Sequence, residues 1–448
     1  MMSTEKAYID LFKTHEALIK RTCGPVMNTP RAVAMDAFTS LGFPTSRQEA
    51  YRDCDLGPAL ERDYGMNLQR LSIPVDPHQV FSCDVPNLST LLYFVVNDQF
   101  YAGNSASRLP EGVLCGSLNA LSQSHEAVLA PYYNKLAASS KDGMAAFNTA
   151  FAQDGFVLYV PKGVVLEKPI QVINILRAPE DMLVQRRVLV ILEKGAQATL
   201  LFCDHALSAN NLFANQVIEL FVDEDARLSF YELEMNHPQT TRVSHAFAAV
   251  STRANLLMNT VTLNNGFTRN NTSVRFEGEH AEVSLSGIVL AETGQFVDNH
   301  VEVDHALPHC VSNQLYKYVL DGEAGGIFAG SIMVRKDAQK TAAYQSNKNL
   351  CGPQAKMRAR PQLEIYADDV KCSHGSATGQ MDENALFYLR SRGISEKEAR
   401  LLMKYAFTTD VIDTISLEPL KDRMRMLVEK RFRGELARCA GCSAAYCH

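Results

Sequence analysis

The order of hydrophobic and polar positions divides the chain into three parts. Between about residues 155 and 375, short apolar runs alternate with polar turns many times over. Runs of this length are typical of β-strands and are too short for amphipathic helices. Before and after this segment, apolar residues recur at helical spacing. The pattern therefore predicts a mainly helical part at 1–150, a β-rich core at 151–380 and a helical part at 381–448.

The β-rich core contains a repeat. Four of its turns close with an alanine, at Ala196, Ala226, Ala254 and Ala281, which are 27 to 30 residues apart. Ala338 follows 57 residues after Ala281, which is about two repeats. A period of this length, made only of strands and turns, indicates a solenoid, most simply a parallel β-helix, although a β-sandwich also has alternating strands. In a β-helix the four turns should stack above one another.

Two amphipathic helices are predicted after the core. Ser395 and Glu398 form a capping box at the start of the first helix, and Pro419 stands where the second helix begins. Such helices either cap a solenoid or bind a partner. The apolar residues that we expect to contact a partner are Leu402, Met403, Phe407 and Met424.

Composition and charge limit the possible functions. The chain has 44 basic and 50 acidic residues and a net charge of −6, which argues against a broad nucleic-acid surface. Its first ten residues, MMSTEKAYID, contain no apolar segment of the signal-peptide kind, and no apolar run is long enough for a bilayer. We therefore expect a cytoplasmic protein that does not enter membranes, with its eleven irregularly spaced cysteines reduced.

The first candidate site is a Cys-x-His pair. Cys372 and His374 lie in a predicted strand, where residues i and i+2 point to the same face. Their Cα atoms would be about 6.6 Å apart, and a thiolate with an imidazole suits zinc or iron. Two ligands do not complete a four-coordinate site, so further ligands would be needed. The alternative is a buried cysteine beside a hydrogen-bonded histidine.

A second polar pattern lies in the predicted strand from Phe296 to Asp304. Asp298, His300, Glu302 and Asp304 fall on one face of it. This face could hold an acid–base or metal site. The pattern favours the simpler interpretation, the solvated outer surface of a half-buried strand.

The last ten residues contain four soft ligands in the pattern Cys-x2-Cys followed by Cys-His, namely Cys439, Cys442, Cys447 and His448. This spacing suits a metal or a redox pair. A terminal segment with incidental thiols is an equally good interpretation. The chain has no P-loop, so any nucleotide hydrolysis would belong to a partner.

Several stretches resemble the SufD branch of the SufB/SufD family, which belongs to the SUF iron–sulfur cluster assembly machinery. The resemblance is strong over residues 154–407 and weaker before them. The stretches that carry it are DGFVLYVPKGV at 154–164, VDNH at 297–300, LYKYVLD at 315–321, residues 325–349, residues 363–375 and LFYLRSRGI at 386–394.

This resemblance implies a right-handed parallel β-helix flanked by helical parts, which would pair with SufB through the β-helices. It also implies that the ATPase SufC docks on the C-terminal helices. In the family, the nascent cluster is thought to form where SufB and SufD meet, with a cysteine from SufB and a histidine from SufD. His374 matches that histidine and Cys372 matches a nearby family cysteine. Transient iron or a nascent cluster would then be the cargo, while flavin binding and a homodimer of the isolated chain stay undetermined.

The chain departs from the family pattern at Tyr51, where tryptophan is usual, and at Cys351, where leucine is more usual. The cysteine-rich tail is not part of that pattern. The expected function is a non-catalytic scaffold subunit. One alternative is a polysaccharide-active β-helix enzyme of the secreted type, disfavoured because no signal peptide and no clear catalytic carboxylate pair are found. Another is a stand-alone metal or sulfur relay that uses the tail.

Overall fold

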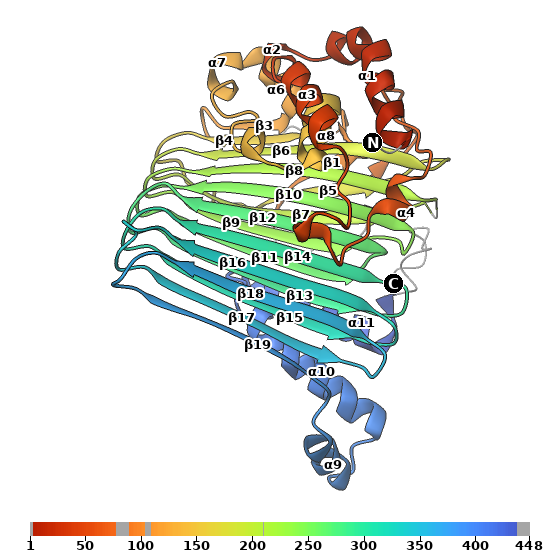
Figure 1. Cartoon of the computed structure of the whole chain (residues 1–448), viewed down its shortest axis with the longest axis vertical. Helices are drawn as coiled ribbons and strands as arrows, with labels where there is room; N and C mark the ends of the chain where they lie inside the picture. Colours follow the sequence, from red (N-terminus) through yellow and green to blue (C-terminus); the bar gives the residue numbers. More distant parts are fainter. Residues whose placement is uncertain (1–2, 78–88, 104–108, 209, 437–448) are drawn as a thin grey trace.

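The centre of the protein is a parallel β-solenoid of about eight turns, with helices before and after it (Figure 1). The computed structural model describes residues 3–77, 89–103, 109–208 and 210–436. Successive strands alternate between two sheets, and all neighbouring pairs from β4 onward are parallel. The predicted β-helix is confirmed, and the antiparallel β-sandwich alternative is wrong.

Each turn of the solenoid adds one strand to each sheet. Sheet A contains, in spatial order, β18 (Lys356–Ile365), β16 (Gly325–Val334), β14 (Phe296–His305), β12 (Phe267–Phe276), β10 (Thr240–Val250), β8 (Leu212–Val222), β6 (Met182–Leu192), β4 (Phe156–Val160) and β3 (Leu114–Ser117). Sheet B contains β19 (Lys371–Gly379), β17 (Ala342–Cys351), β15 (Val311–Leu320), β13 (Glu282–Ala291), β11 (Asn255–Asn264), β9 (Arg227–Met235), β7 (Gln197–Ala206), β5 (Ile170–Leu176), β1 (Leu91–Val96) and β2 (Gln99–Phe100). Because β1 pairs in parallel with β5, the solenoid begins inside the segment predicted to be mainly helical.

The alanine turns stack as predicted. Ala196, Ala226, Ala254 and Ala281 are at most 1% exposed. Backbone hydrogen bonds of 2.9 Å connect each alanine turn to the next one. In each case the carbonyl of the earlier alanine accepts from the amide of the residue that directly follows the later alanine. The residue before each alanine has a positive φ, between 55° and 71°, which reverses the chain between the two sheets. Only a small side chain fits at the position after it, inside the stack.

Ala338 does not belong to this column. Cys310 and Thr341 take the next two places after Ala281, since the amide of Ala342 donates to the carbonyl of Cys310 at 3.0 Å. The turn before Ala342 has seven residues, from 335 to 341, so Ala338 lies three residues too early. Its carbonyl instead accepts from the Thr341 hydroxyl at 2.8 Å.

The space between the sheets is apolar on the side of the alanine turns and polar toward the other side. Asp204 contacts Arg186 and Arg242, each at 2.9 Å, and Arg242 also contacts Glu232 at 2.7 Å. Burial raises the pKa of Asp204, but the two guanidinium groups outweigh it and lower the pKa below its usual value. These buried charges are thus paired rather than isolated.

Helices cover sheet A near its first strands (Figure 1). The N-terminal helical elements are α1 (Ser3–Arg21), α2 (Pro25–Asn28), α3 (Arg31–Leu41), η1 (Glu49–Tyr51), α4 (Gly57–Leu60), α6 (Leu118–Ser124), α7 (Glu126–Leu129), η2 (Ala137–Ser139) and α8 (Gly143–Phe151). Apolar clusters join these helices to sheet A, and Glu219 of β8 adds a polar attachment. This carboxylate contacts Arg187 at 2.6 Å and accepts backbone hydrogen bonds from Asn134, Leu136 and Ala137 at 2.8 to 3.1 Å.

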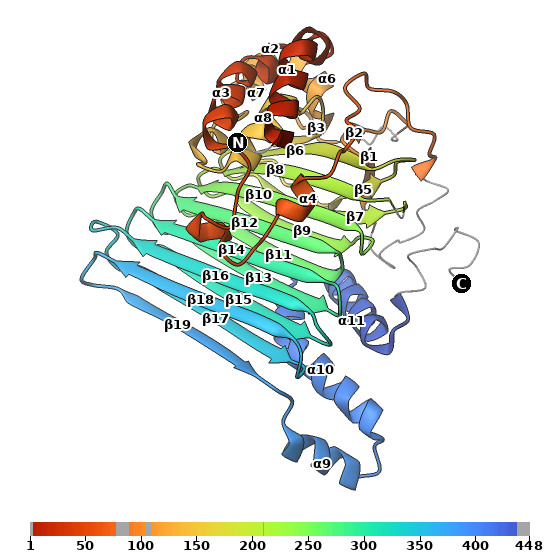
Figure 2. The ribbon, with the colours of Figure 1, turned by 45° about the vertical axis from the view of Figure 1, so that its right-hand side comes forward.

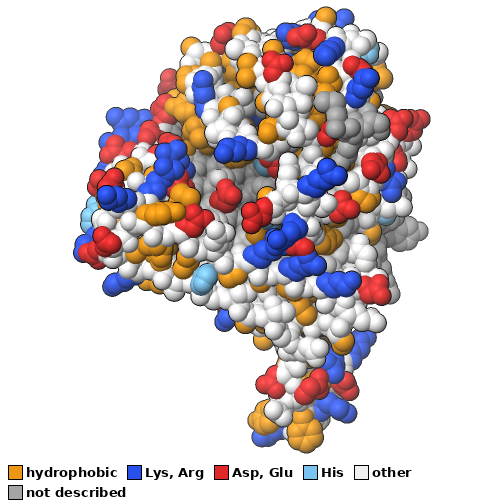
Figure 3. Space-filling model, viewed as in Figure 1, with side chains coloured by type: hydrophobic (Ala, Val, Ile, Leu, Met, Phe, Trp, Pro, Cys, Tyr) orange, Lys and Arg blue, Asp and Glu red, His pale blue; other side chains and the backbone are white. Residues whose placement is uncertain are grey.

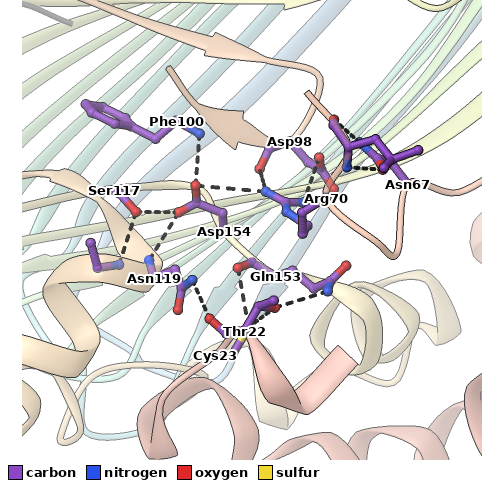
Figure 4. Close-up of polar contacts among 12 residues, drawn as sticks. Thr22, Cys23, Asn67, Arg70, Asp98, Phe100, Ser117, Asn119, Gln153 and Asp154 are labelled. Atoms are coloured by element: carbon purple, nitrogen blue, oxygen red, sulfur yellow. Dashed lines mark hydrogen bonds and ion pairs between the residues drawn. The ribbon is translucent and has the colours of Figure 1, made fainter. Parts of the chain in front are cut away.

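A second attachment lies where the helical part joins the solenoid (Figure 4). Asp154 accepts hydrogen bonds from the Ser117 hydroxyl at 2.7 Å and from the amides of Phe100 and Asn119 at 2.9 and 3.1 Å. Arg70 lies 3.9 Å away. Burial raises the pKa of the Asp154 carboxyl. One side chain therefore joins four segments at the start of β4.

The segment around η1 crosses the outer face of sheet A, as Figure 2 shows. The Arg269 guanidinium stacks on the Tyr51 ring at 3.7 Å and pairs with Asp298 at 2.5 Å. Asp53 pairs with Arg358 and Arg360 on β18. The N-terminal segment therefore contacts strands from the middle of the solenoid to its last turn.

The C-terminal helices are α9 (Glu383–Ser391), α10 (Glu396–Ile412) and α11 (Glu418–Arg433). Helices α10 and α11 pack on the outer face of sheet B, whereas α9 projects beyond the last strands (Figures 1 and 2). Lys317 of β15 donates to Asp410 at 2.6 Å, and Arg431 donates to the carbonyl of Leu263 at 2.6 Å. No helix in the described part of the chain is long and apolar enough to cross a membrane.

The buried Arg187–Glu219 pair gives the first testable prediction. Glu219→Gln removes the charge that compensates Arg187, and both side chains are fully buried. We expect the free energy of unfolding to fall by about 3–5 kcal/mol, measured by urea denaturation. Glu224→Gln is the matched control, since Glu224 pairs with Lys194 and Arg253 at an exposed turn and should change stability little. Equal effects of the two variants would contradict the assigned role of Glu219.

Candidate functional site

No helix or strand of the described residues pairs with the free edges of the last solenoid turn. Strands β18 and β19 are the last strands of sheets A and B, and each pairs with a neighbour on one side only. Almost every residue of β19 is exposed. Tyr344, Ile365 and Tyr366 add apolar area at this end, at 43%, 41% and 63% exposure. An uncovered strand with free backbone donors and acceptors is a template for another strand.

Cys372 and His374 both lie on this last strand. In the register of β19 with β17, Cys372 is opposite Ala343 and His374 is opposite Gln345. Ala343 and Gln345 are buried between the sheets. The side chains of the two candidate ligands, which are aligned with them, therefore lie on the inner face of the last strand, at the open end of the solenoid. Cys372 is half-buried against the apolar residues of this turn, and His374 is exposed. Both candidate ligands therefore lie on one face of β19, the arrangement expected for residues i and i+2 of a strand.

The local environment differs between the two candidates. Burial raises the pKa of the Cys372 thiol, and a backbone hydrogen bond with Ala343 opposes this effect. A thiol of this kind is a poor ligand until it loses its proton. The imidazole of His374 is exposed, and a neutral imidazole has an unprotonated ring nitrogen that can bind a metal directly.

The pair does not form a complete site within the described residues. No group of three or more His, Cys, Asp or Glu side chains lies close enough there to hold a metal ion. Any metal bound at His374 would need ligands from solvent, from another chain or from residues outside the described ranges. The predicted tail ligands Cys439, Cys442, Cys447 and His448 lie outside the described residues. None of the seven cysteines of the described part forms a disulfide.

One predicted partner contact is corrected by the structure. Met424 is 3% exposed, in the apolar cluster that packs α11 onto sheet B. Phe407 also packs against this cluster, and Lys317 lies 4.8 Å from its ring centre. Met403 is half-buried, and only Leu402, at 41%, is well exposed. The sequence shows that a helix has an apolar stripe but not which surface that stripe covers.

The exposed apolar side chains lie instead on α9. Phe387 and Tyr388 are 72% and 57% exposed on the projecting helix. The sequence contains a sign of this exposure. Leu386, Phe387 and Tyr388 are three consecutive apolar residues, and one face of a helix cannot bury all three. Only Leu386 of α9 is buried. Phe387 and Tyr388 are not among the partner contacts predicted from the sequence.

The strand from Phe296 to Asp304 is only partly a solvated surface. Asp298 is fully buried with Arg269, and Arg269 lowers the pKa of its carboxyl although burial raises it. His300 lies 3.2 Å from Asp298, Glu302 is exposed, and Asp304 pairs with Arg335 at 2.7 Å. The N-terminal segment that covers Asp298 comes from far along the sequence, so the strand pattern alone could not reveal its burial.

Residues 174–407 match the SufBD core domain of SUF system iron–sulfur cluster assembly, and residues 2–172 match the SufBD protein N-terminal region. Together with the solenoid and its helical flanks, these matches define an iron–sulfur cluster assembly protein. The chain belongs to the SufBD family.

Three relatives illustrate the range of similarity. A SufBD family iron–sulfur cluster assembly protein of Synechocystis is 28% identical over 93% of both chains. The iron–sulfur cluster assembly protein SufD of Escherichia coli is 31% identical over 54% of this chain and 58% of its own length. SufD of Bacillus subtilis is 24% identical over 78% of this chain and 81% of its own length.

The corrected position of Met424 gives the second prediction. Met424→Ala should lower the free energy of unfolding by about 2–5 kcal/mol, because it leaves a cavity between α11 and sheet B. Leu402→Ala, on the neighbouring helix, should change it by only about 0.5 kcal/mol. Chemical denaturation of both variants measures the difference. A Met424→Ala protein as stable as the wild type would mean that α11 does not depend on this contact.

Proposed function

We propose that this chain is a non-catalytic scaffold subunit of iron–sulfur cluster assembly. It pairs with SufB through the open end of the solenoid and with the ATPase SufC through its C-terminal helices. Iron or a nascent cluster is the cargo held where the chain meets SufB. The observation that carries the proposal is the open last turn, with His374 and Cys372 on its inward-facing line.

The open end suits pairing with another solenoid. A second chain can add strands to β18 and β19, so that the backbone hydrogen bonds continue across the junction. Exposed Tyr344, Ile365 and Tyr366 would be buried by this pairing. The same edge could pair two copies of this chain when SufB is absent.

His374 is the proposed ligand to the cargo, and Cys372 supports it or shares the role. This arrangement explains why the described residues offer an incomplete set of ligands, because SufB would supply the missing ones. A site split between two chains exists only when both are assembled, which prevents either chain alone from holding the cargo tightly.

The proposed contact with the ATPase lies on α9 and the exposed start of α10. Phe387, Tyr388 and Leu402 provide the apolar surface, and aromatic residues commonly dominate the energy of such contacts. Helix α11 holds α10 in position by packing on sheet B. ATP hydrolysis would then act on the chain through this projecting element.

The third prediction tests the ligand. His374→Ala should reduce maturation of an iron–sulfur reporter enzyme about tenfold or more, in cells that have no other assembly system. The complex should still form, because the exposed imidazole contributes nothing to the core. His309→Ala is the control, since His309 is an exposed histidine on a turn.

Two outcomes would contradict the proposal for His374. Full reporter activity would remove it from the site. Loss of activity together with loss of the complex, detected by co-purification, would make it a structural residue of the junction. Iron content of the purified chain alone, with and without residues 439–448, separates the shared site from a relay centred on the tail: the shared site predicts little iron in either form.

The fourth prediction tests the ATPase contact. The double variant Phe387→Asp, Leu402→Asp should weaken capture of the ATPase at least about tenfold, since it places charge in an apolar contact. Val33→Asp is the matched control, because Val33 and Phe387 are both 72% exposed. Circular dichroism confirms that each variant is folded. Unchanged capture by the double variant would exclude this surface.

A further inference from the structure

One segment of the N-terminal part runs across the strands of sheet A instead of along them. After α3 the chain reaches β18, the last strand of this sheet, where Asp53 pairs with Arg358 and Arg360. It then returns to β6, where Gly65 forms a β-bridge. Residues 53–65 thus extend from the last turn of the solenoid to one of its first turns (Figure 2).

The attachment to β6 uses the backbone. The amide of Gly65 donates to the carbonyl of Asp181 at 3.0 Å, and its carbonyl accepts from the amide of Leu183 at 3.0 Å. Strand β4 pairs with β6 only from Val188 onward, so Gly65 occupies a position on β6 that β4 does not reach. This end of the segment is therefore part of sheet A itself.

Between its two ends the segment covers a row of outward-facing side chains. In the register of sheet A, one row runs straight across β10, β12, β14, β16 and β18 and consists of Val243, Arg269, Asp298, Ile327 and Arg358. The first four of them are at most 3% exposed. Leu56 and Leu60 of the segment belong to the apolar cluster that also contains Val243 and Ile327. The segment is thus firmly packed on the middle turns.

The last turn has little of its own to keep it folded. Each turn of a solenoid is stabilised by packing on its neighbours, and this turn has a neighbour on one side only. Strands β18 and β19 are described in full and contain no buried residue. The outer face of β18 carries Lys356, Arg358 and Arg360 at alternate positions, and Figure 3 shows basic side chains gathered on this face of the molecule. A turn of this kind is expected to open locally.

Asp53 compensates two of these cations from outside the turn. Its side chain is 14% exposed, whereas those of Arg358 and Arg360 are 59% and 30% exposed. A carboxylate that is shared by two guanidinium groups and mostly removed from water binds them more strongly than an isolated surface ion pair would. Because Tyr51 and Cys54 on either side of it are buried, the carboxylate is held in place by the rest of the segment.

We propose that residues 51–68 form a brace that couples the last turn of the solenoid to its early turns and keeps the open end folded while no partner covers it. Opening of β18 has to break its contact with a segment that is anchored on β6 and on the middle turns. The last turn is thereby stabilised by distant turns and not by its neighbour alone. A preformed edge also lowers the entropy cost of pairing with a partner, a consequence that rests on the proposed function.

Hydrogen–deuterium exchange of the full chain, followed by mass spectrometry of its peptides, tests the brace. Asp53→Asn removes the charge and keeps the shape of the side chain. The amides of β18 and β19 that donate to β16 and β17 should then exchange at least about tenfold faster than in the wild type, which corresponds to about 1.4 kcal/mol of opening free energy. Amides of β6, β8 and β10 should exchange at unchanged rates.

Asp369→Asn is the matched control. Asp369 also lies in the last turn, but it pairs with Lys340 of the neighbouring turn and does not connect the end to distant turns. As an exposed pair it contributes little, so exchange in β18 and β19 should rise about threefold at most. An equal effect of Asp53→Asn and Asp369→Asn would contradict the brace.

Leu60→Ala tests whether the coupling runs along the segment. Leu60 is 2% exposed, and the apolar cluster to which it belongs contains no residue of β18 or β19. A brace predicts that this distant variant also speeds exchange in β18, by about threefold or more, whereas a purely local role of Asp53 predicts no change there. Circular dichroism verifies that each variant is folded, and Leu60→Val is the milder replacement if Leu60→Ala is not.

Two further results would overturn parts of the proposal. Unchanged exchange of β18 and β19 in Asp53→Asn would remove the brace altogether. Faster exchange combined with unchanged capture of SufB would keep the brace and refute its contribution to pairing. Since exchange is measured on the chain alone, failure of the brace and failure of the proposed function are separate outcomes.

Discussion

In-register stacking of the solenoid turns is the constraint on which the rest of the structure depends. Every strand from β4 to β17 has a paired strand on both sides, so its backbone hydrogen bonds run to the turn before it and to the turn after it. Such a stack has a first turn and a last turn, and the chain treats these two ends differently. At the start, short antiparallel strands and helices cover the first turn. At the other end β18 and β19 stay uncovered, so the protein has one closed end and one end available for pairing.

Apolar clusters and buried charges together hold the N-terminal helical part onto this stack. Glu219 fixes the backbone of residues 134–137 to sheet A, and Arg269 fixes the η1 segment by contacting Tyr51 and Asp298. Such pairs contribute less to net stability than apolar packing would, but they tolerate few alternative arrangements. On sheet B, apolar packing of α10 and α11 is likewise combined with ion pairs, Lys317 with Asp410 and Arg431 with Glu292, whereas α9 projects beyond the last strands.

The solenoid could be predicted from the sequence because its turns repeat a local pattern. In each turn a residue in the left-handed backbone conformation is followed by a residue with a small side chain, as at Arg253 and Ala254. It failed for Ala338, where the turn is longer, and for Met424, where an apolar stripe faces the protein itself. The Cys372–His374 pair was predictable from strand geometry, because two residues of one strand need no tertiary information. The burial of Asp298 was not, because the N-terminal segment that covers it packs there from far along the sequence.

The repeating turn also sets how proteins of this architecture can change in length. A single inserted residue within a strand would move every following inward side chain to the outer face, so whole turns of about thirty residues are the natural unit of growth or loss. Each such unit would move the open end by about 4.8 Å, the spacing of paired strands. The distance from the N-terminal helices to the proposed cargo ligand can therefore change during evolution only in steps of one turn. Finer adjustment has to come from the partner that covers the last turn.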